Sequence, residues 1–213
     1  ERVLIDVCPH TLGTEIAESI NGVHSAGIFS PILERNTVIP ASRSQTYVTI
    51  SKNQTQIVLP IYQGESRMVK NNTKLGEITV KVPAAPAGEQ SVEVRFTYDV
   101  SGLLEVDVLV CHTKERKQLL IHSGANQLTA AEITARREVL AGLKTPPEDM
   151  QQNKALLGRL ERLYQELLAH EREHISELSR RFSAALQSQD PQLIERERKS
   201  IQAALEVFET SWL

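Results

Sequence analysis

The 213-residue sequence predicts a β + α protein, in which an antiparallel β-sandwich is followed by an α-helical bundle. Three observations lead to this fold class. Apolar and polar residues alternate in several runs before residue 128, which is the spacing of half-buried strands. Eight of the ten glycines also lie before residue 128. The final 86 residues hold 26 charged side chains and space their apolar residues by three or four, which is typical of helices.

Two consecutive runs give the clearest strands. In residues 92–100, Val92, Val94 and Phe96 alternate with polar or charged residues, and the pattern resumes at 104–110. Ser101-Gly102 between the runs is a turn signal, so together they predict an antiparallel hairpin. Shorter runs of the same kind occupy residues 46–51, 56–62, 78–82 and 119–121. Seven or eight strands at this spacing indicate an antiparallel sandwich.

Helical signals begin near residue 128. Thr129 precedes Glu132 by three residues, which is the spacing of a capping box and predicts a first helix. The segment Thr145-Pro146-Pro147-Glu148 predicts a second helix start, because proline is favoured at the first helical position. One long amphipathic pattern follows, formed by Leu156, Leu160, Leu163, Leu167, His174, Leu178, Phe182 and Leu186.

The last predicted helix opens at Asp190-Pro191. Its apolar stripe consists of Ile194, Ile201, Leu205, Phe208 and Trp212. The helical part is therefore expected to form a small bundle or an antiparallel helical hairpin.

Composition excludes several function classes. A formal charge of −3 gives no basic surface for a phosphate backbone, so we expect no nucleic-acid partner. No apolar run approaches the roughly 18 to 20 residues needed to cross a bilayer, so we expect no membrane partner. Cys8 and Cys111 lie far apart without a metal or disulfide pattern, which favours free thiols and a cytoplasmic location.

Residues 170–174 match a catalytic motif. His170-Glu171-Arg172-Glu173-His174 matches the HExxH pattern of zinc proteases, in which two histidines share a helix face. The extended form of that motif requires Gly and His at positions 177 and 180, where this chain has Glu177 and Arg180. We therefore expect no catalytic residues and no metal, and a zinc metalloprotease remains an alternative. The chain also lacks GxxxxGK[ST] and GxGxxG, so we expect no cofactor within it.

Several segments resemble the peptide-binding domain of the DnaK-type heat-shock chaperones. The first is an apolar lead followed by Asp6-Val7-Cys8-Pro9-His10-Thr11-Leu12-Gly13. The others follow in the family's order: Ile32 to Pro40, Tyr62-Gln63-Gly64-Glu65, Asn72 to Gly76, and Phe96 to Val106. The resemblance covers most of residues 3–133, and the divergence is similar to that of the HscC branch.

The resemblance implies a fold, a boundary and a function. Residues 1–123 correspond to the β-sandwich substrate-binding domain, and residues 124–213 to an α-helical lid. The implied function is to bind short extended hydrophobic segments of unfolded client proteins. An N-terminal ATPase domain, absent from this chain, is expected to control release with ATP, and a J-domain co-chaperone is an expected partner. A helical-bundle adaptor that binds a folded partner is the other alternative.

Site residues are implied by the positions that match the family. The client pocket is expected to be lined by Thr14, Tyr47, Ile57, Leu59 and Val92. Ile16 and Val48 are expected beside the client backbone, and Ile50 and Ala17 are expected to form an arch over it. Asp6, Arg35 and Asn36 match positions that couple the sandwich to the ATPase domain.

Two departures from the family pattern alter these expectations. About eight additional residues lie between Ala17 and Arg35, so we expect one side of the cleft to be remodelled. Ala87 stands where the family has the arginine that latches the lid, so a loosely held lid is expected.

Overall fold

The computed structural model describes residues 5–124 and 127–210, and the predicted stripe position Trp212 lies outside them. The chain divides into two compact units, residues 1–144 and residues 145–213. This division falls after the first helix, whereas the resemblance placed a boundary between residues 123 and 124. No helix in the described part of the chain is long and apolar enough to cross a membrane.

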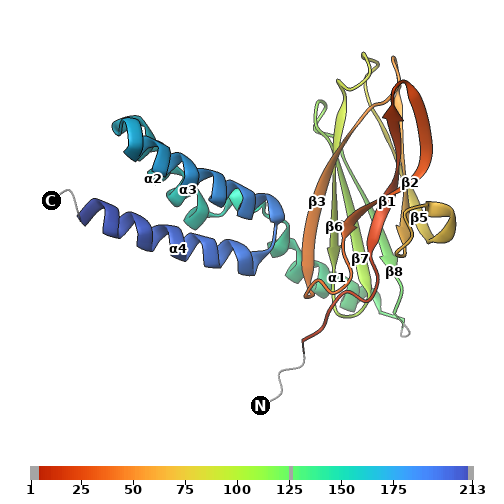
Figure 1. Cartoon of the computed structure of the whole chain (residues 1–213). Coiled ribbons are helices and arrows are strands. Elements are labelled where there is room, and N and C mark those ends of the chain that lie inside the picture. The colour runs from red at the N-terminus through yellow and green to blue at the C-terminus, as the bar shows by residue number, and fades with distance from the viewer. Residues whose placement is uncertain (1–4, 125–126, 211–213) are drawn as a thin grey trace. The chain divides into compact units, whose positions relative to one another are not determined.

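The first unit is an eight-stranded antiparallel sandwich (Figure 1). One sheet has the strand order β2-β1-β4-β5, and the other has the order β3-β6-β7-β8. The strands are β1 (Leu12–Ile20), β2 (Val23–Leu33), β3 (Ala41–Val48), β4 (Gln56–Gln63), β5 (Thr73–Lys81), β6 (Ser91–Tyr98), β7 (Leu103–Val110) and β8 (Arg116–His122). A short 3-10 turn, η1 (Val69–Asn71), precedes β5. The predicted fold class is confirmed.

The core of the sandwich follows the predicted alternation. Val92, Val94 and Phe96 of β6 have no exposed surface, and they pair with β7 in register, with Phe96 opposite Val106. Both strands therefore turn one apolar face toward the opposite sheet, where burial of each such side chain contributes about 1.5 to 3 kcal/mol. The same core includes Leu12, Leu33, Ile57, Leu59, Ile61, Ile78, Val80, Leu104 and Val108.

Helix α1 (Ala130–Ala141) belongs to the first unit. It starts at the predicted capping box: the Glu132 backbone N–H donates to Thr129 Oγ1 at 3.2 Å, and the Thr129 N–H donates to the Glu132 carboxylate at 2.8 Å. A 3-10 turn, η2 (Gly142–Lys144), continues the chain.

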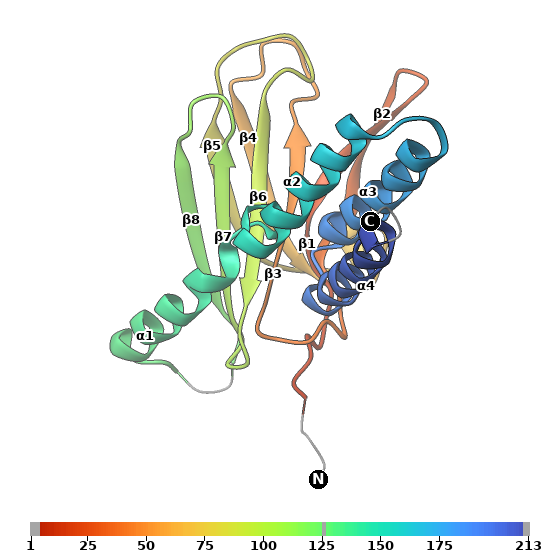
Figure 2. The ribbon, with the colours of Figure 1, turned by 90° about the vertical axis from the view of Figure 1, so that its left-hand side faces the viewer.

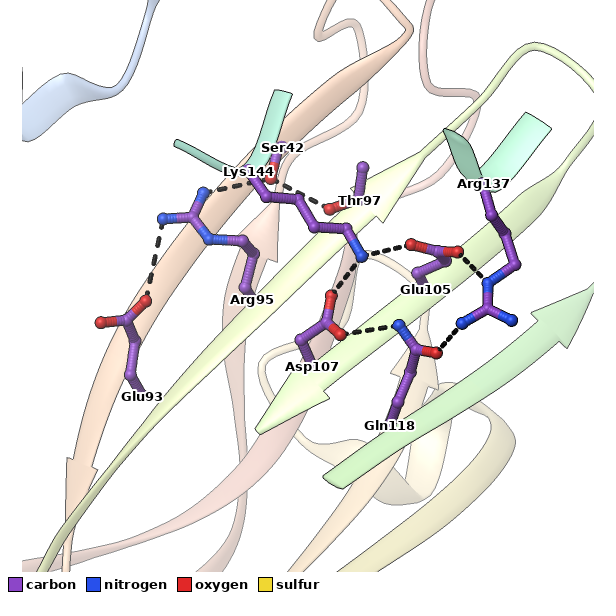
Figure 3. Close-up of polar contacts among 9 residues, drawn as sticks. All are labelled: Ser42, Glu93, Arg95, Thr97, Glu105, Asp107, Gln118, Arg137 and Lys144. Carbon is purple, nitrogen blue, oxygen red and sulfur yellow. Dashed lines mark hydrogen bonds and ion pairs between the residues drawn. The ribbon is translucent and has the colours of Figure 1, made fainter. Parts of the chain in front are cut away.

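Charged side chains attach α1 and η2 to the outer face of the second sheet (Figure 3). Glu105 of β7 is only 1% exposed, and its carboxylate accepts from Arg137 of α1 at 2.8 Å and pairs with Lys144 of η2. The Lys144 ammonium also lies 2.8 Å from Asp107. The buried carboxylate is therefore compensated by two cations, both contributed by the helical segment.

A second polar group lies on the same face of this sheet (Figure 3). Arg95 of β6 is 7% exposed and donates to Ser42 Oγ of β3 at 3.1 Å. The hydroxyls of Ser42 and Thr97 lie 3.0 Å apart. Hydrogen bonds thus satisfy the buried polar side chains of Arg95, Ser42 and Thr97 on this face.

The second unit consists of α2 (Gln151–Glu166), α3 (Ala169–Ser188) and α4 (Pro191–Thr210), preceded by the 3-10 turn η3 (Pro147–Asp149). Its core is formed by Leu156, Leu160, Leu163, Ile175, Leu178, Phe182, Ala185, Leu186, Ile194, Ile201 and Leu205. The predicted small bundle is confirmed, and α2 starts four residues after Pro147.

Two details of the long amphipathic pattern were wrong. The pattern is interrupted between α2 and α3, where Leu167 and Leu168 are extended and Ala169 has a φ of 50°. Beyond this break Leu178, Phe182 and Leu186 are buried as predicted, but Ile175 is buried in place of His174, which is exposed. The His174 ring instead packs against Phe208, with ring centroids 5.9 Å apart.

Candidate functional site

Strands β1 and β4 separate soon after they meet. Their ladder pairs Leu12 with Gln63, Gly13 with Tyr62 and Thr14 with Ile61. Beyond Thr14, β1 continues to Ile20 in pairing with β2, and β4 remains paired with β5 back to Gln56. Within the described residues, the facing edges of β1 and β4 therefore have no ladder partner past this point.

The sequence explains where the ladder ends. The next pair would place Glu15 opposite Pro60, and proline has no N–H to donate to a neighbouring strand. The carbonyl of Pro60 faces β1 and accepts a hydrogen bond from Thr14 Oγ1 at 2.7 Å. This side-chain bond satisfies a buried backbone acceptor that the ladder leaves unpaired.

A groove of about 560 Å³ lies where the two strands separate. Its walls come from β1, β2, β3, β4 and β5 and from the loop after β3. The lining residues are Glu15, Ile16, Ala17, Ala26, Thr46, Tyr47, Val48, Ile50, Gln54, Ile57, Val58, Leu59, Pro60, Tyr62, Lys74 and Glu77. An unpaired strand edge beside an apolar wall can bind an extended polypeptide through both its backbone and its side chains.

Most of the residues implied by the resemblance lie together in this groove. Seven of the nine line it, namely Ile16, Ala17, Tyr47, Val48, Ile50, Ile57 and Leu59. Thr14 and Val92 do not line it, because both are fully buried. Thr14 bonds to Pro60 beside the groove, and Val92 lies in the sandwich core opposite Tyr47 of β3.

Tyr47 is held in a fixed position in the groove. Its hydroxyl and Ser30 Oγ of β2 are 2.9 Å apart, so this bond connects the two sheets. Burial raises the pKa of Tyr47, and the hydrogen bond to Ser30 opposes that shift only in part. The phenol therefore stays neutral at physiological pH and presents an uncharged ring to the groove.

Exposed aliphatic side chains border the same groove. Val48, Val58 and Ile50 are 52%, 45% and 47% exposed, although each is a large apolar residue. Contiguous exposed apolar residues around a concave site mark a surface that binds another molecule.

Sequence reasoning missed several lining residues, including Val58, Pro60, Lys74 and Glu77. Lys74 Nζ donates to the Glu77 carboxylate at 2.7 Å. A proline within the apolar run 56–62 was the available signal, since proline inside a strand marks a position where pairing stops.

The three expected coupling residues lie near one another, away from the groove. Asn36 adopts a φ of 66°, and its N–H donates to the Cys8 carbonyl at 2.8 Å. The Asp6 carbonyl accepts from the Ile39 N–H at 3.0 Å. The Arg35 guanidinium lies 3.7 Å from the carboxylate of Glu65.

Glu65 is the acceptor around which this second region is organised. Its carboxylate accepts from the Thr11 backbone N–H at 2.8 Å and from the Thr11 hydroxyl at 2.9 Å. The pKa of Glu65 is lowered chiefly by the backbone bond from Thr11, with Arg35 contributing. A cavity of about 480 Å³ lies here, lined in part by Arg35, Asn36 and Glu65.

The HExxH segment lies on α3 in the helical unit, where His170 and His174 are exposed. Among the described residues, no group of three or more His, Cys, Asp or Glu side chains is placed to hold a metal ion. The two cysteines are free thiols, and Cys8 is buried.

A β-sandwich with an open apolar groove, followed along the chain by a helical bundle, is the architecture that the resemblance to chaperones implied. A family model described as Hsp70 protein matches residues 1–212. The chain belongs to the Hsp70 family.

Proposed function

We propose that the groove binds short, extended, hydrophobic segments of unfolded client proteins. The observation that carries this proposal is the separation of β1 from β4 at Pro60, beside a groove lined by Ile50, Ile57 and Leu59. Such a site binds the client backbone by hydrogen bonds, which depend little on the client sequence. It also holds one apolar client side chain in a pocket.

The expected energetics favour reversible binding. Burial of one Leu-sized client side chain contributes about 1.5 to 3 kcal/mol, and the backbone hydrogen bonds each contribute about 1 kcal/mol. Ordering the client opposes these gains. Affinity should therefore be modest and similar for many aliphatic clients.

Fluorescence anisotropy with a labelled Leu-rich heptapeptide tests the proposal. Ile57→Phe fills the groove and should weaken binding by about 10-fold to 100-fold, which corresponds to the loss of one buried side chain. Val139→Phe is the matched control, because Val139 is 71% exposed on α1 and lies outside the groove. If the wild-type chain does not bind the heptapeptide, or if Ile57→Phe binds it equally well, the proposed role of the groove is wrong. Either result would favour the helical-bundle adaptor.

The finer assignment follows from the segments that resemble DnaK-type chaperones and the HscC branch. In this proposal the helical unit acts as a lid, and an ATPase domain preceding these residues controls client release with ATP. A J-domain co-chaperone is the proposed partner of that domain. The chain itself is proposed to have no catalytic residues, metal or cofactor, and to act in the cytoplasm.

The lid is proposed to be held loosely, because Ala87 offers no side chain for a latching ion pair. Hydrogen exchange of the peptide-free protein checks this point. Full protection of the helical unit without peptide would contradict it.

A further inference from the structure

The β1–β2 hairpin continues past the groove as a two-stranded arm, residues 18–25. Its ladder pairs Glu18 with Ser25, Ser19 with His24 and Ile20 with Val23. Asn21 and Gly22 close the hairpin with φ values of 51° and 79°, the conformation of a tight two-residue turn. In Figure 2 the tip of this hairpin stands apart from the neighbouring strands.

Two apolar side chains are exposed at the tip of the arm. Ile20 is 64% exposed and Val23 is 67% exposed. Because they are directly opposite each other in the ladder, their side chains lie on one face and form a single apolar contact surface.

The arm is uncharged toward its tip. Residues 19–27 contain no Asp, Glu, Lys or Arg, although 24% of the chain is charged. They also lack the Lys and Pro residues that commonly protect a strand edge from pairing with another chain. This surface therefore suits an apolar, extended partner rather than a charged one.

The base of the arm is anchored to the sandwich. Glu18 forms an ion pair with Arg67 at 3.4 Å, and the Phe29 N–H donates to the Arg67 carbonyl at 2.8 Å. Ile28 forms a bridge with Met68. These contacts hold the base of the arm against residues 67–68.

We propose that the arm is a second contact region for the client held in the groove, which rests on the proposed function above. The edge of β1 that lines the groove at Glu15, Ile16 and Ala17 continues to Ile20, past an irregularity in the β1–β2 ladder between Ile16 and Glu18. Ile20 lies three residues beyond Ala17 and four beyond Ile16, so a client extended along this edge reaches the tip about four residues from the one opposite Ile16. The preferred clients then carry a second apolar residue about four positions from the one in the groove.

Anisotropy with three labelled peptides tests this inference on the full chain. The first is a heptapeptide with one Leu cluster; the others are 13-residue peptides with a second Leu pair on its amino-terminal or carboxyl-terminal side. Ile20→Ser/Val23→Ser removes the apolar tip, and Val139→Ser is an exposed-valine control outside the arm and groove. Because all three residues are exposed, we expect the variants to keep the wild-type circular dichroism spectrum.

One of the two long peptides should bind the unmutated chain about tenfold more tightly than the heptapeptide. The arm variant should lose this gain and keep heptapeptide binding, whereas Val139→Ser should keep both. If all three peptides bind equally, or if the arm variant still binds the long peptide more tightly than the heptapeptide, the inference about the arm is wrong. The proposed function of the groove would then still stand. Absence of heptapeptide binding to the unmutated chain would overturn the proposed function as well. A dimer in light scattering that disappears in the arm variant would show that a second copy occupies the tip, and would also overturn the inference.

Discussion

The hydroxyl of Thr14 donates to the carbonyl of Pro60 at 2.7 Å, at the position where β1 and β4 separate. Thr14→Val keeps the side-chain shape but leaves this buried carbonyl without its donor. We expect the free energy of unfolding to fall by about 1 to 3 kcal/mol. Urea unfolding followed by circular dichroism measures the change. Thr55→Val, at an exposed position, should differ from wild type by less than about 0.5 kcal/mol, and an equal loss in both variants would contradict the assigned role.

Pro60 itself keeps the groove open in this interpretation. Pro60→Ala supplies an N–H that faces β1, so the ladder should extend to Glu15 and narrow the groove. Heptapeptide affinity should fall by about fivefold, since one new strand hydrogen bond contributes about 1 kcal/mol. Hydrogen exchange gives a direct readout, because the new amide at position 60 should be protected. Rapid exchange of that amide would show that proline does not end the ladder.

The contact between Lys144 and Glu105 predicts how α1 is attached to the sheet. Lys144→Met removes one of two cations from a carboxylate that is 1% exposed, and Arg137 remains. We expect the free energy of unfolding to fall by about 1 to 3 kcal/mol, which is less than the cost of breaking an isolated buried ion pair. Amide exchange across α1 should increase. Lys199→Met, which removes an exposed pair with Glu195, should leave α1 unchanged.

The ion pair between Lys144 and Glu105 should remain intact at neutral pH. Burial alone would lower the pKa of Lys144, but its hydrogen bonds to Asp107 and Glu105 outweigh this effect and raise the pKa above the ordinary 10.5. A raised lysine pKa stabilises the fold fully below the unfolded value and loses that contribution as pH rises through the folded value. Protection of α1 should therefore fall only above pH 10.5 in wild type, and this alkaline step should be absent in Lys144→Met.

The start of α1 should respond to acid. The pKa of Glu132 lies below its ordinary 4.5, chiefly because the Thr129 backbone N–H donates to its carboxylate. A lowered carboxyl pKa stabilises the fold above the unfolded value and loses that contribution as pH falls through the folded value. NMR should show the first turn of α1 fraying below pH 4.5. Thr129→Ala should fray it at neutral pH, and an intact first turn in that variant would contradict the capping role.

Arg172 should stabilise the break between α2 and α3. Its Nε donates to the carbonyls of Tyr164 and Leu167 at 3.0 and 2.9 Å, and its guanidinium lies 5.1 Å from the centre of the Tyr164 ring. Arg172→Ala should cost the helical unit about 1 to 2 kcal/mol, measured by thermal unfolding. Arg162→Ala, which removes an exposed ion pair with Glu166 at 3.9 Å, should have a smaller effect.

Local patterns in the sequence were sufficient for much of the architecture. The alternation of apolar and polar residues in 92–100 and 104–110 predicted β6 and β7, because a strand with one buried face places apolar residues at every second position. The Thr129–Glu132 spacing predicted the start of α1, because a capping box forms between residues three apart. Family resemblance supplied the seven groove residues, because the sequence pattern alone favours an ordinary sandwich core for Ile57 and Leu59.

Tertiary contacts decided the rest. The break at Leu167 and Leu168 occurs without glycine or proline, so only the packing of α2 and α3 into one core and the Arg172 hydrogen bonds account for it. Glu105 has the sequence character of a solvated residue, yet it is buried because two cations distant in sequence lie over it. The sequence by itself determined β4 to β8 and the starts of α1 and α4, since those depend on neighbouring residues, whereas none of the predicted runs covered β1 or β2. The groove required the fold, because it exists only where the Thr14 and Pro60 segments, 46 residues apart, meet and then separate.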